Sequence, residues 1–233
     1  MADTKRSDDR EPGQIRAMEI KLDPLNNADG STTFKFGRTE TMAGVYGPRE
    51  AKIHQRSSEE SIVTVHIAAS RGDRDAGRAN EAFLRQTLEA VVMRDRNPLC
   101  AIEVSCQTML DEGSALAANV NSAIMALVSA AVPLRAVAAG VACAVMPDGA
   151  IIVDPSKSEE VEAQAVLTFV FEGPAETPAP KRKLIAVEST GCVSEEQLEA
   201  AMEACAAAVE HVINFSRMGV EQQVQKRQKI HSS

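Results

Sequence analysis

The sequence predicts a mixed α/β fold in which helices cover the faces of mixed sheets. Short segments with alternating apolar residues occur in both halves of the chain. Longer segments with apolar residues at three- and four-residue spacing lie between and after them. The resulting order is strands, helix, strand, helix, strands, helix. Because an amphipathic helix must cover its apolar stripe, this order favours helices packed on sheet faces.

The N-terminal part predicts a β-meander. Residues 32–36 alternate with period two, and Gly37 supplies a turn to a second strand at 41–46. We expect that second strand to end at Gly47-Pro48. Residues 61–68 (SIVTVHIA) are rich in Ile and Val and predict a third strand.

The middle of the chain predicts two helices separated by a strand. Residues 71–78 (RGDRDAGR) are charged and contain glycine, which predicts a loop. Residues 81–93 then show helical spacing of apolar residues, and residues 101–110 are typical of a strand. An Ala-rich helix follows Gly113-Ser114 and runs to about residue 131. It is apolar nearly all round, so we expect it to be buried between layers.

The last third predicts a hairpin at 137–153 and strands at 164–171 and 184–187. Residues 194–197 (SEEQ) fit a capping box, because the Ser hydroxyl can accept from a backbone N–H three residues on while Gln reaches back. The amphipathic helix that follows is predicted to have about five turns.

These elements predict one domain over residues 15–217. We expect residues 1–14 to form a flexible N-terminal tail and residues 218–233 to form a polar, basic C-terminal tail.

Composition argues against independent nucleic-acid binding. The net charge is -8, whereas a protein that holds nucleic acid by a broad basic face is usually basic. Aromatic residues make up only 3% of the chain and Trp is absent, so a platform for base stacking is not expected. RNA would have to be bound by a small local basic patch, or by a basic surface that other subunits complete.

Cysteine usage and hydropathy narrow the class of protein and the compartment in which it works. The five cysteines are odd in number and form no CxxC pair, so we expect no zinc site and no disulfide framework. We also expect no other metal site and no cofactor. The N-terminal residues lack the apolar core of a signal peptide, and no apolar run is long enough to span a membrane. We expect an intracellular protein that has no membrane partner.

Several segments together carry a family resemblance. They are ADGS at 28–31, FGRT at 36–39, VYGP at 45–48, LRQTLEA at 84–90, VNSA at 120–123, AVPLR at 131–135, IVDP at 152–155 and AVLTF at 165–169. Each motif is weak alone. In this order and spacing, over residues 8–217, they resemble the RNase PH family as found in ring subunits of the eukaryotic RNA exosome, and they indicate one subtype of ring subunit.

The resemblance implies an RNase PH-like fold and a place in a six-membered ring that takes part in RNA processing and degradation, including that of ribosomal RNA. It implies other RNase PH-type subunits, RNA-binding cap subunits and single-stranded RNA in the ring pore as partners. It also implies location in the nucleus and nucleolus, and in the cytoplasm.

Active members of the family hold phosphate with a Thr or Ser and an Arg at a helix N-terminus. Here the matching positions are Ser114, Ala115 and Leu116, preceded by the acidic Glu112. The resemblance therefore implies a degenerate phosphate site and a subunit without phosphorolytic activity.

Active members also carry paired carboxylates after the hairpin, which match Asp154 and Glu160. These are candidates for a vestigial catalytic pair. Asp154 before a proline is also compatible with a residue that ends a strand and starts a turn. An alternative function is a free-standing, metal-dependent nuclease in which Asp154, Glu160 and Asp111 hold a divalent ion.

Arg71, Arg74 and Arg78 match a basic loop that faces the RNA path in the family, and Arg85 lies on the following helix. These residues are the candidate RNA contacts, because arginines bind phosphates without sequence preference. Two alternatives stay open: a solvated loop in which aspartates offset the charge, and an interface role for Arg85. A third general hypothesis is an RNase PH-like fold with a binding role unrelated to RNA.

Overall fold

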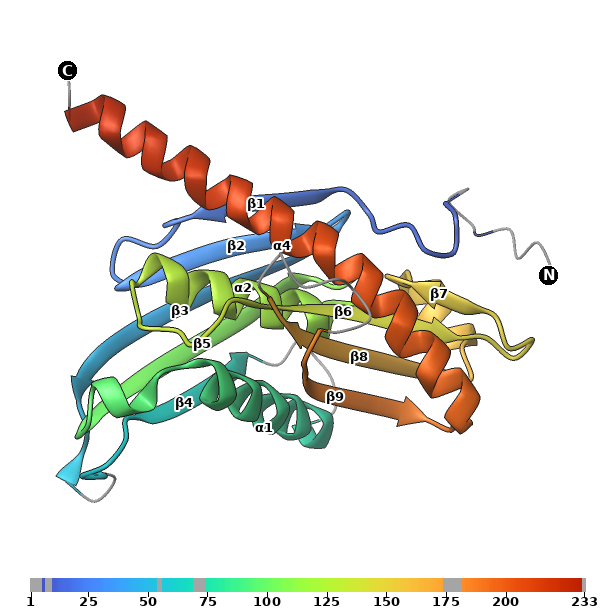
Figure 1. The fold of residues 1–233 in the computed structure, drawn as a ribbon, viewed down its shortest axis with the longest axis horizontal. Coiled ribbons are helices and arrows are strands. Elements are labelled where there is room, and N and C mark those ends of the chain that lie inside the picture. The colour runs from blue at the N-terminus through green and yellow to red at the C-terminus, as the bar shows by residue number, and fades with distance from the viewer. Residues whose placement is uncertain (1–5, 7–9, 54–55, 69–73, 174–181, 232–233) are drawn as a thin grey trace.

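The structure, a computed structural model, describes residue 6 and residues 10–53, 56–68, 74–173 and 182–231. Two sheets and the helices packed on them make up the fold (Figure 1). This arrangement confirms the predicted mixed α/β class.

The first sheet is built from the N-terminal half of the chain. Its strands are β1 (Met18–Leu22), β2 (Gly30–Phe36), β3 (Thr39–Glu50), β4 (Ile62–Ala68) and β5 (Cys100–Leu110), in the order β1-β2-β3-β5-β4. Neighbouring strands are antiparallel except β4 and β5, which run parallel. The parallel pair requires a crossover, and helix α1 (Arg74–Val91) supplies it. β1 and β4 therefore stand at the two edges of this sheet.

The second sheet is built from the C-terminal half and is antiparallel throughout. Its strands are β6 (Ala138–Val145), β7 (Ile151–Val153), β8 (Ala165–Glu172) and β9 (Leu184–Gly191), in the order β7-β6-β8-β9. The short helix α3 (Lys157–Glu162) connects β7 to β8. β9 is an edge strand, and Val187 on it has 43% of its surface exposed.

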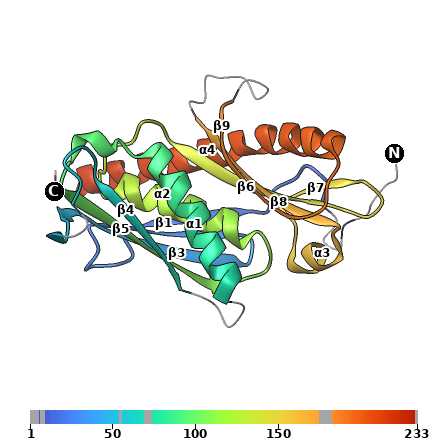
Figure 2. The same ribbon diagram turned by 90° about the horizontal axis from the view of Figure 1, so that it is seen from below.

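Helix α2 (Ala115–Ser129) lies between the sheets, as its apolar sequence predicts (Figure 2). It contacts strands of both sheets, including β2, β3 and β6. Gly30 allows this approach, because a Cβ built there would lie 2.2 Å from the backbone nitrogen of Ala130. Asn121 joins the helix to β6 by accepting from the Gly140 N–H and donating to the Gly140 carbonyl, at 2.8 and 2.9 Å.

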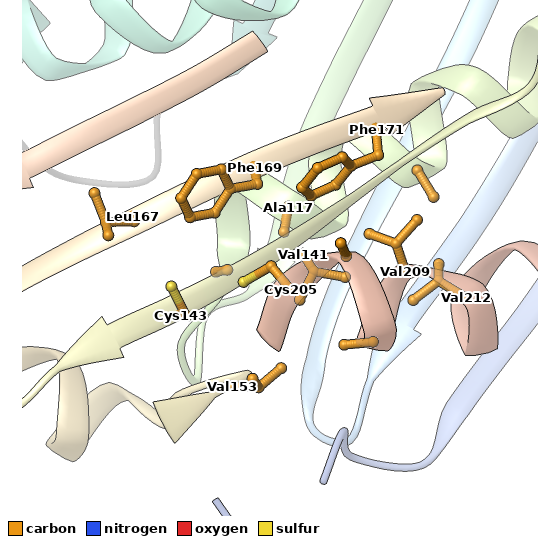
Figure 3. Packing of buried hydrophobic residues seen from close by; sticks show 14 of the residues in the cluster. Ala117, Val141, Cys143, Val153, Leu167, Phe169, Phe171, Cys205, Val209 and Val212 are labelled. Carbon is orange, nitrogen blue, oxygen red and sulfur yellow. The ribbon is translucent and has the colours of Figure 1, made fainter. Parts of the chain in front are cut away.

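Helix α4 (Glu195–His231) covers the outer face of the second sheet and continues onto β1. Figure 3 shows Cys205, Val209 and Val212 of α4 facing β6 and β8, where Phe169 and Phe171 are buried. A second apolar cluster lies between the first sheet, α1 and α2. The core thus divides at α2, which contributes side chains to both parts.

The structure departs from the sequence-based elements at several places. The three N-terminal strands do not form the predicted β-meander, because β4 pairs in parallel with β5 and not with β3. β1 and α3 fall in segments for which no element was predicted. β3 continues through the cis Gly47-Pro48 bond instead of ending there, and a shift in its register with β5 accommodates the proline. Helix α1 begins at Arg74, inside the segment predicted to be a loop. β9 extends past residue 187 to Gly191, because β8 offers pairing partners up to that point.

A further difference is the length of α4, which runs through residues predicted to form a tail. Gly219 permits close packing, since a Cβ there would lie 2.6 Å from Ile20 Cγ2 of β1. One turn later, Gln223 donates to Asp23 at 2.7 Å. These contacts support the helix beyond its apolar stripe. Among the described residues, no helix has the length and apolar character needed to cross a membrane.

Candidate functional site

The segment that the resemblance implies to be a degenerate phosphate site is the turn that joins β5 to α2. Two residues in it have positive φ, Gly113 at 98° and Ser114 at 59°. A Cβ at Gly113 would lie 2.4 Å from the carbonyl oxygen of Pro155, so this turn rests directly on the backbone after β7. The two segments also exchange hydrogen bonds: the Lys157 N–H donates to the Glu112 carbonyl at 3.0 Å, and Ser114 Oγ donates to the Pro155 carbonyl at 3.2 Å.

Glu160 supplies an internal anion at the start of α2. Its Oε1 accepts from the Ser114 N–H at 2.7 Å, and its Oε2 lies 3.2 Å from Lys157 Nζ. Helix N-termini favour negative charge, because their first N–H groups lack partners within the helix. A carboxylate of the protein itself therefore occupies a helix terminus where the resemblance implied bound phosphate.

Two side chains lie beside this terminus: Leu116, which is apolar, and Lys157, which is already paired with acidic residues. Leu116 packs against the second apolar cluster. The nearby ammonium of Lys157 is held by Asp111, with Nζ 2.8 Å from Oδ2, and by Glu160. Burial acts to lower the pKa of Lys157, but the hydrogen bond to Asp111 and the charge of Glu160 outweigh it and raise the pKa, so the ammonium stays charged.

Asp154 is buried in an ion pair with the N-terminal segment. Arg16 donates two hydrogen bonds to the Asp154 carboxylate, from Nε to Oδ2 at 2.8 Å and from Nη2 to Oδ1 at 2.6 Å. Arg10 Nη1 lies 3.5 Å from Oδ2. Arg16 also donates to the carbonyls of Glu112 and Gly113, at 2.9 and 3.0 Å. One guanidinium thus ties Asp154 to the turn before α2.

Arg6 makes a second, similar contact next to the first. Its Nε and Nη2 lie 2.9 Å from the two oxygens of the buried Glu159, and it donates to the carbonyls of Val153 and Asp154. Burial acts to raise the pKa of Glu159, but the hydrogen bonds from Arg6 and from the Ser156 N–H lower it on balance.

Sequence reasoning missed Arg6 and Arg10, because the polar residues 1–14 suggested a tail, and it missed Arg16, because its pairing with Asp154 is set by tertiary structure. The available signal was the repeated occurrence of Arg in that segment together with the acids after the hairpin. The structure brings Glu160 and Asp111 together through Lys157, while Arg16 engages Asp154 separately. Among the described residues, no group of acidic, His or Cys side chains is arranged to hold a metal.

The candidate RNA contacts lie on another part of the molecule. Arg71 falls outside the described residues, and Arg74 is the first residue of α1. Arg78 and Arg85 are exposed on α1 and line a hollow of about 420 Å³ beside edge strand β4. Glu81, between them on the helix, accepts from the Ile67 N–H of β4 at 2.9 Å.

Comparison with known families assigns this architecture. Two models of the 3′ exoribonuclease family, RNase PH, match the chain: domain 1 over residues 14–133 and domain 2 over residues 136–208. The chain belongs to the RNase PH family. The boundary between the matches falls just before β6, where the first sheet with its helices gives way to the second.

The subtype that the sequence motifs indicate is ribosomal RNA-processing protein 46 (exosome component 5), and relatives of this type are found within the RNase PH family. The rice protein named exosome complex exonuclease RRP46 homolog is 28% identical over 94% of this chain and 96% of its own length. A putative exosome complex component RRP41 from Caenorhabditis elegans is 29% identical over 87% of this chain and 85% of its own. The crystal structure of rice Rrp46 superposes with a TM-score of 0.80, covering 91% of this chain and 98% of that one.

An archaeal exosome core structure matches with a TM-score of 0.77 at 18% identity, covering 92% of each chain. At this identity it supports the fold alone. The predicted RNase PH-like fold and the resemblance to the Rrp46 type are both confirmed.

Replacing Arg16 by Ala is expected to lower the free energy of unfolding by about 3–5 kcal/mol, because it leaves Asp154 buried without its main partner. Urea unfolding followed by circular dichroism measures this. Arg38→Ala is the matched control, since Arg38 is exposed and its replacement should change stability little. Equal decreases for the two variants would contradict a structural role for the Arg16–Asp154 pair.

Proposed function

We propose that this chain is a non-catalytic ring subunit of the RNA exosome, which scaffolds a six-membered ring of RNase PH-like subunits and guides RNA 3′ ends. Its relatives carry exosome names, and its fold is that of an exosome core subunit. The observation that carries the non-catalytic part is Leu116, which stands where active members have a phosphate-binding Arg and packs against the second apolar cluster.

Phosphorolysis requires inorganic phosphate to be held against the RNA backbone, so two anions must be brought together among positive groups. At the start of α2, Glu160 already satisfies the Ser114 N–H, and its negative charge repels phosphate. Leu116, at the position that matches the phosphate-binding arginine, is committed to the apolar cluster. Neither that donor nor the cation is therefore available to phosphate.

The alternative, a metal-dependent nuclease, needs Asp154 as a ligand. Arg16 already binds both oxygens of this carboxylate, and the carboxylate is almost fully buried. A divalent ion would have to displace a guanidinium that three further hydrogen bonds hold in place, one to Thr39 Oγ1 and two to the carbonyls before α2. The same ion pair therefore disfavours the metal site.

The chain is expected to release no nucleoside diphosphates from single-stranded RNA in inorganic phosphate. The removal of one preorganised donor set costs on the order of 100- to 1000-fold in rate. Thin-layer chromatography of labelled products measures release from the purified chain and from its complexes. Phosphate-dependent release that disappears in Asp154→Asn but persists in the exposed control Asp95→Asn would overturn the non-catalytic proposal.

Assembly into a ring is supported by the edges of the two sheets. β4 and β9 are terminal strands, and terminal strands present unpaired backbone groups that another chain can pair with. Glu81 shields one such group on β4. β9 carries the exposed Val187 beside a hollow of about 440 Å³, which Ala79 and Phe83 of α1 border. An open edge with an exposed apolar residue of this kind suits a permanent neighbour.

Val187→Lys is therefore expected to weaken assembly with RNase PH-type partners, because it places a charge on an edge that a neighbour would cover. Co-expression followed by light scattering measures the mass of the complexes. Val161→Lys is the control, since Val161 is 79% exposed on α3 and belongs to neither β4 nor β9. A stable monomer that ignores every RNase PH-type partner would defeat the ring-subunit proposal itself.

RNA guidance is assigned to the exposed face of α1. Arg78 and Arg85 lie on this helix, with Arg74 at its start and Arg71 preceding it in the sequence. Arginines on a helix can neutralise phosphates of a passing strand without reading bases. The net charge of -8 means that neighbours must complete the basic surface.

Replacing Arg78 and Arg85 by Ala should weaken RNA binding by the assembled ring. It should also lower the salt dependence by roughly one unit of slope for each phosphate that is no longer neutralised. Fluorescence anisotropy with labelled oligouridylate at several salt concentrations measures both quantities. Arg38→Ala with Arg96→Ala removes the same charge at exposed sites elsewhere and should change neither. Unchanged affinity and slope in the α1 variant would remove this face from the RNA path.

As part of the same proposal, we place the protein in the nucleus and nucleolus and in the cytoplasm, and assign RNA-binding cap subunits as further partners.

A further inference from the structure

We propose that a groove between α2 and α4 binds a segment of a partner protein that combines apolar side chains with a carboxylate. This surface lies apart from the anion position that Glu160 fills and from the exposed face of α1. Binding at the groove does not depend on RNA guidance by α1.

The groove is a cavity of about 600 Å³ with mostly apolar walls. Met125 and Val128 of α2 form one side, Ile213 and Val220 of α4 form the other, and Val137 closes the end before β6. Val137 has 39% of its surface exposed. The volume is within the range of sites that bury a ligand, about 300–1,000 Å³.

Gly173 allows close packing at this end of the groove. Its N–H donates to the Val137 carbonyl at 2.7 Å, and a Cβ there would lie 3.1 Å from Ile213 Cδ1. The absence of a side chain lets the strand end approach α4 without filling the space between them. The apolar walls are thereby left facing one another across an open volume.

Two exposed arginines, Arg135 and Arg217, line the same groove. Within the described part of the chain, neither side chain is engaged in a hydrogen bond or an ion pair. Glu172 is the acidic residue among the described lining residues, and Lys183 lies beside it, with Nζ 3.6 Å from Oε2. The charge left over at the groove is therefore positive, although the chain as a whole carries -8.

This combination indicates the chemistry of the occupant. Apolar walls call for aliphatic or aromatic side chains, and an arginine beside a desolvated apolar surface binds a carboxylate with good geometry. RNA is less suited, because its backbone would place phosphates against apolar walls. A second copy of the chain is disfavoured by the mutual repulsion of two bodies of net charge -8.

The test uses an array of short synthetic peptides in four classes: apolar with acidic, apolar with basic, apolar with neutral polar, and acidic without apolar residues. The purified full chain should prefer the apolar acidic class. Arg135→Glu with Arg217→Glu should reduce affinity for that class by about tenfold per arginine. The same variant should gain preference for the apolar basic class, which a failure to fold cannot produce.

Two controls separate charge and apolar packing. Arg38→Glu with Arg96→Glu changes the net charge equally at exposed sites outside the groove, and should leave the preference unaltered. Val137→Lys should abolish binding of every apolar class, whereas Val161→Lys should not.

Three outcomes would overturn the proposal. The first is equal binding of all peptide classes, or a preference that the double arginine variant does not alter. The second is binding of oligouridylate, but of no peptide, through Arg135 and Arg217. The third is self-association in light scattering that the same variant removes, which would make a second copy the occupant.

Discussion

The ion pair between Arg16 and Asp154 is the contact on which the site depends. Arg16 precedes the first sheet, Asp154 follows β7 of the second sheet, and the same guanidinium binds the carbonyls of the turn before α2. Buried charges are tolerated only when their partners and hydrogen bonds are supplied, and here they are supplied from three parts of the chain. The pair therefore fixes how the two halves meet at the start of α2.

Glu160 shows how the start of α2 can be stable without an anion from outside the chain. The first N–H groups of a helix need acceptors, whether or not a substrate provides one. Glu160 accepts from the Ser114 N–H, and Lys157 offsets its charge while also bonding Asp111. This N–H is thus satisfied without phosphate. Leu116 adds apolar packing where a cation would have had to stay near solvent.

The fold was largely predictable because apolar patterns report burial directly. β4 and β5 show alternating apolar residues, and α2 and β8 are apolar on nearly all sides, as buried elements are. The length of α4 was not predictable from the sequence, since its last turns depend on tertiary contacts. Gly219 packs against Ile20 of β1, and Gln223 donates to Asp23, the residue after β1. The candidate site was likewise only partly predictable. The resemblance pointed to Asp154, but the sequence did not reveal its partner Arg16, because their pairing is set by tertiary structure.

The distribution of arginines links the acidic composition to the proposed roles. Arg6, Arg10 and Arg16 are used inside the protein, where they neutralise Glu159 and Asp154. Other, exposed arginines line two different surfaces, the hollow beside β4 and the groove between α2 and α4. The first surface has charged borders suited to a phosphate backbone, whereas the second has apolar walls suited to a protein segment. With a net charge of -8, neither surface is equipped to hold a polyanion unaided. A small number of arginines, each placed on a distinct surface, is the arrangement expected of a subunit whose partners complete its binding sites.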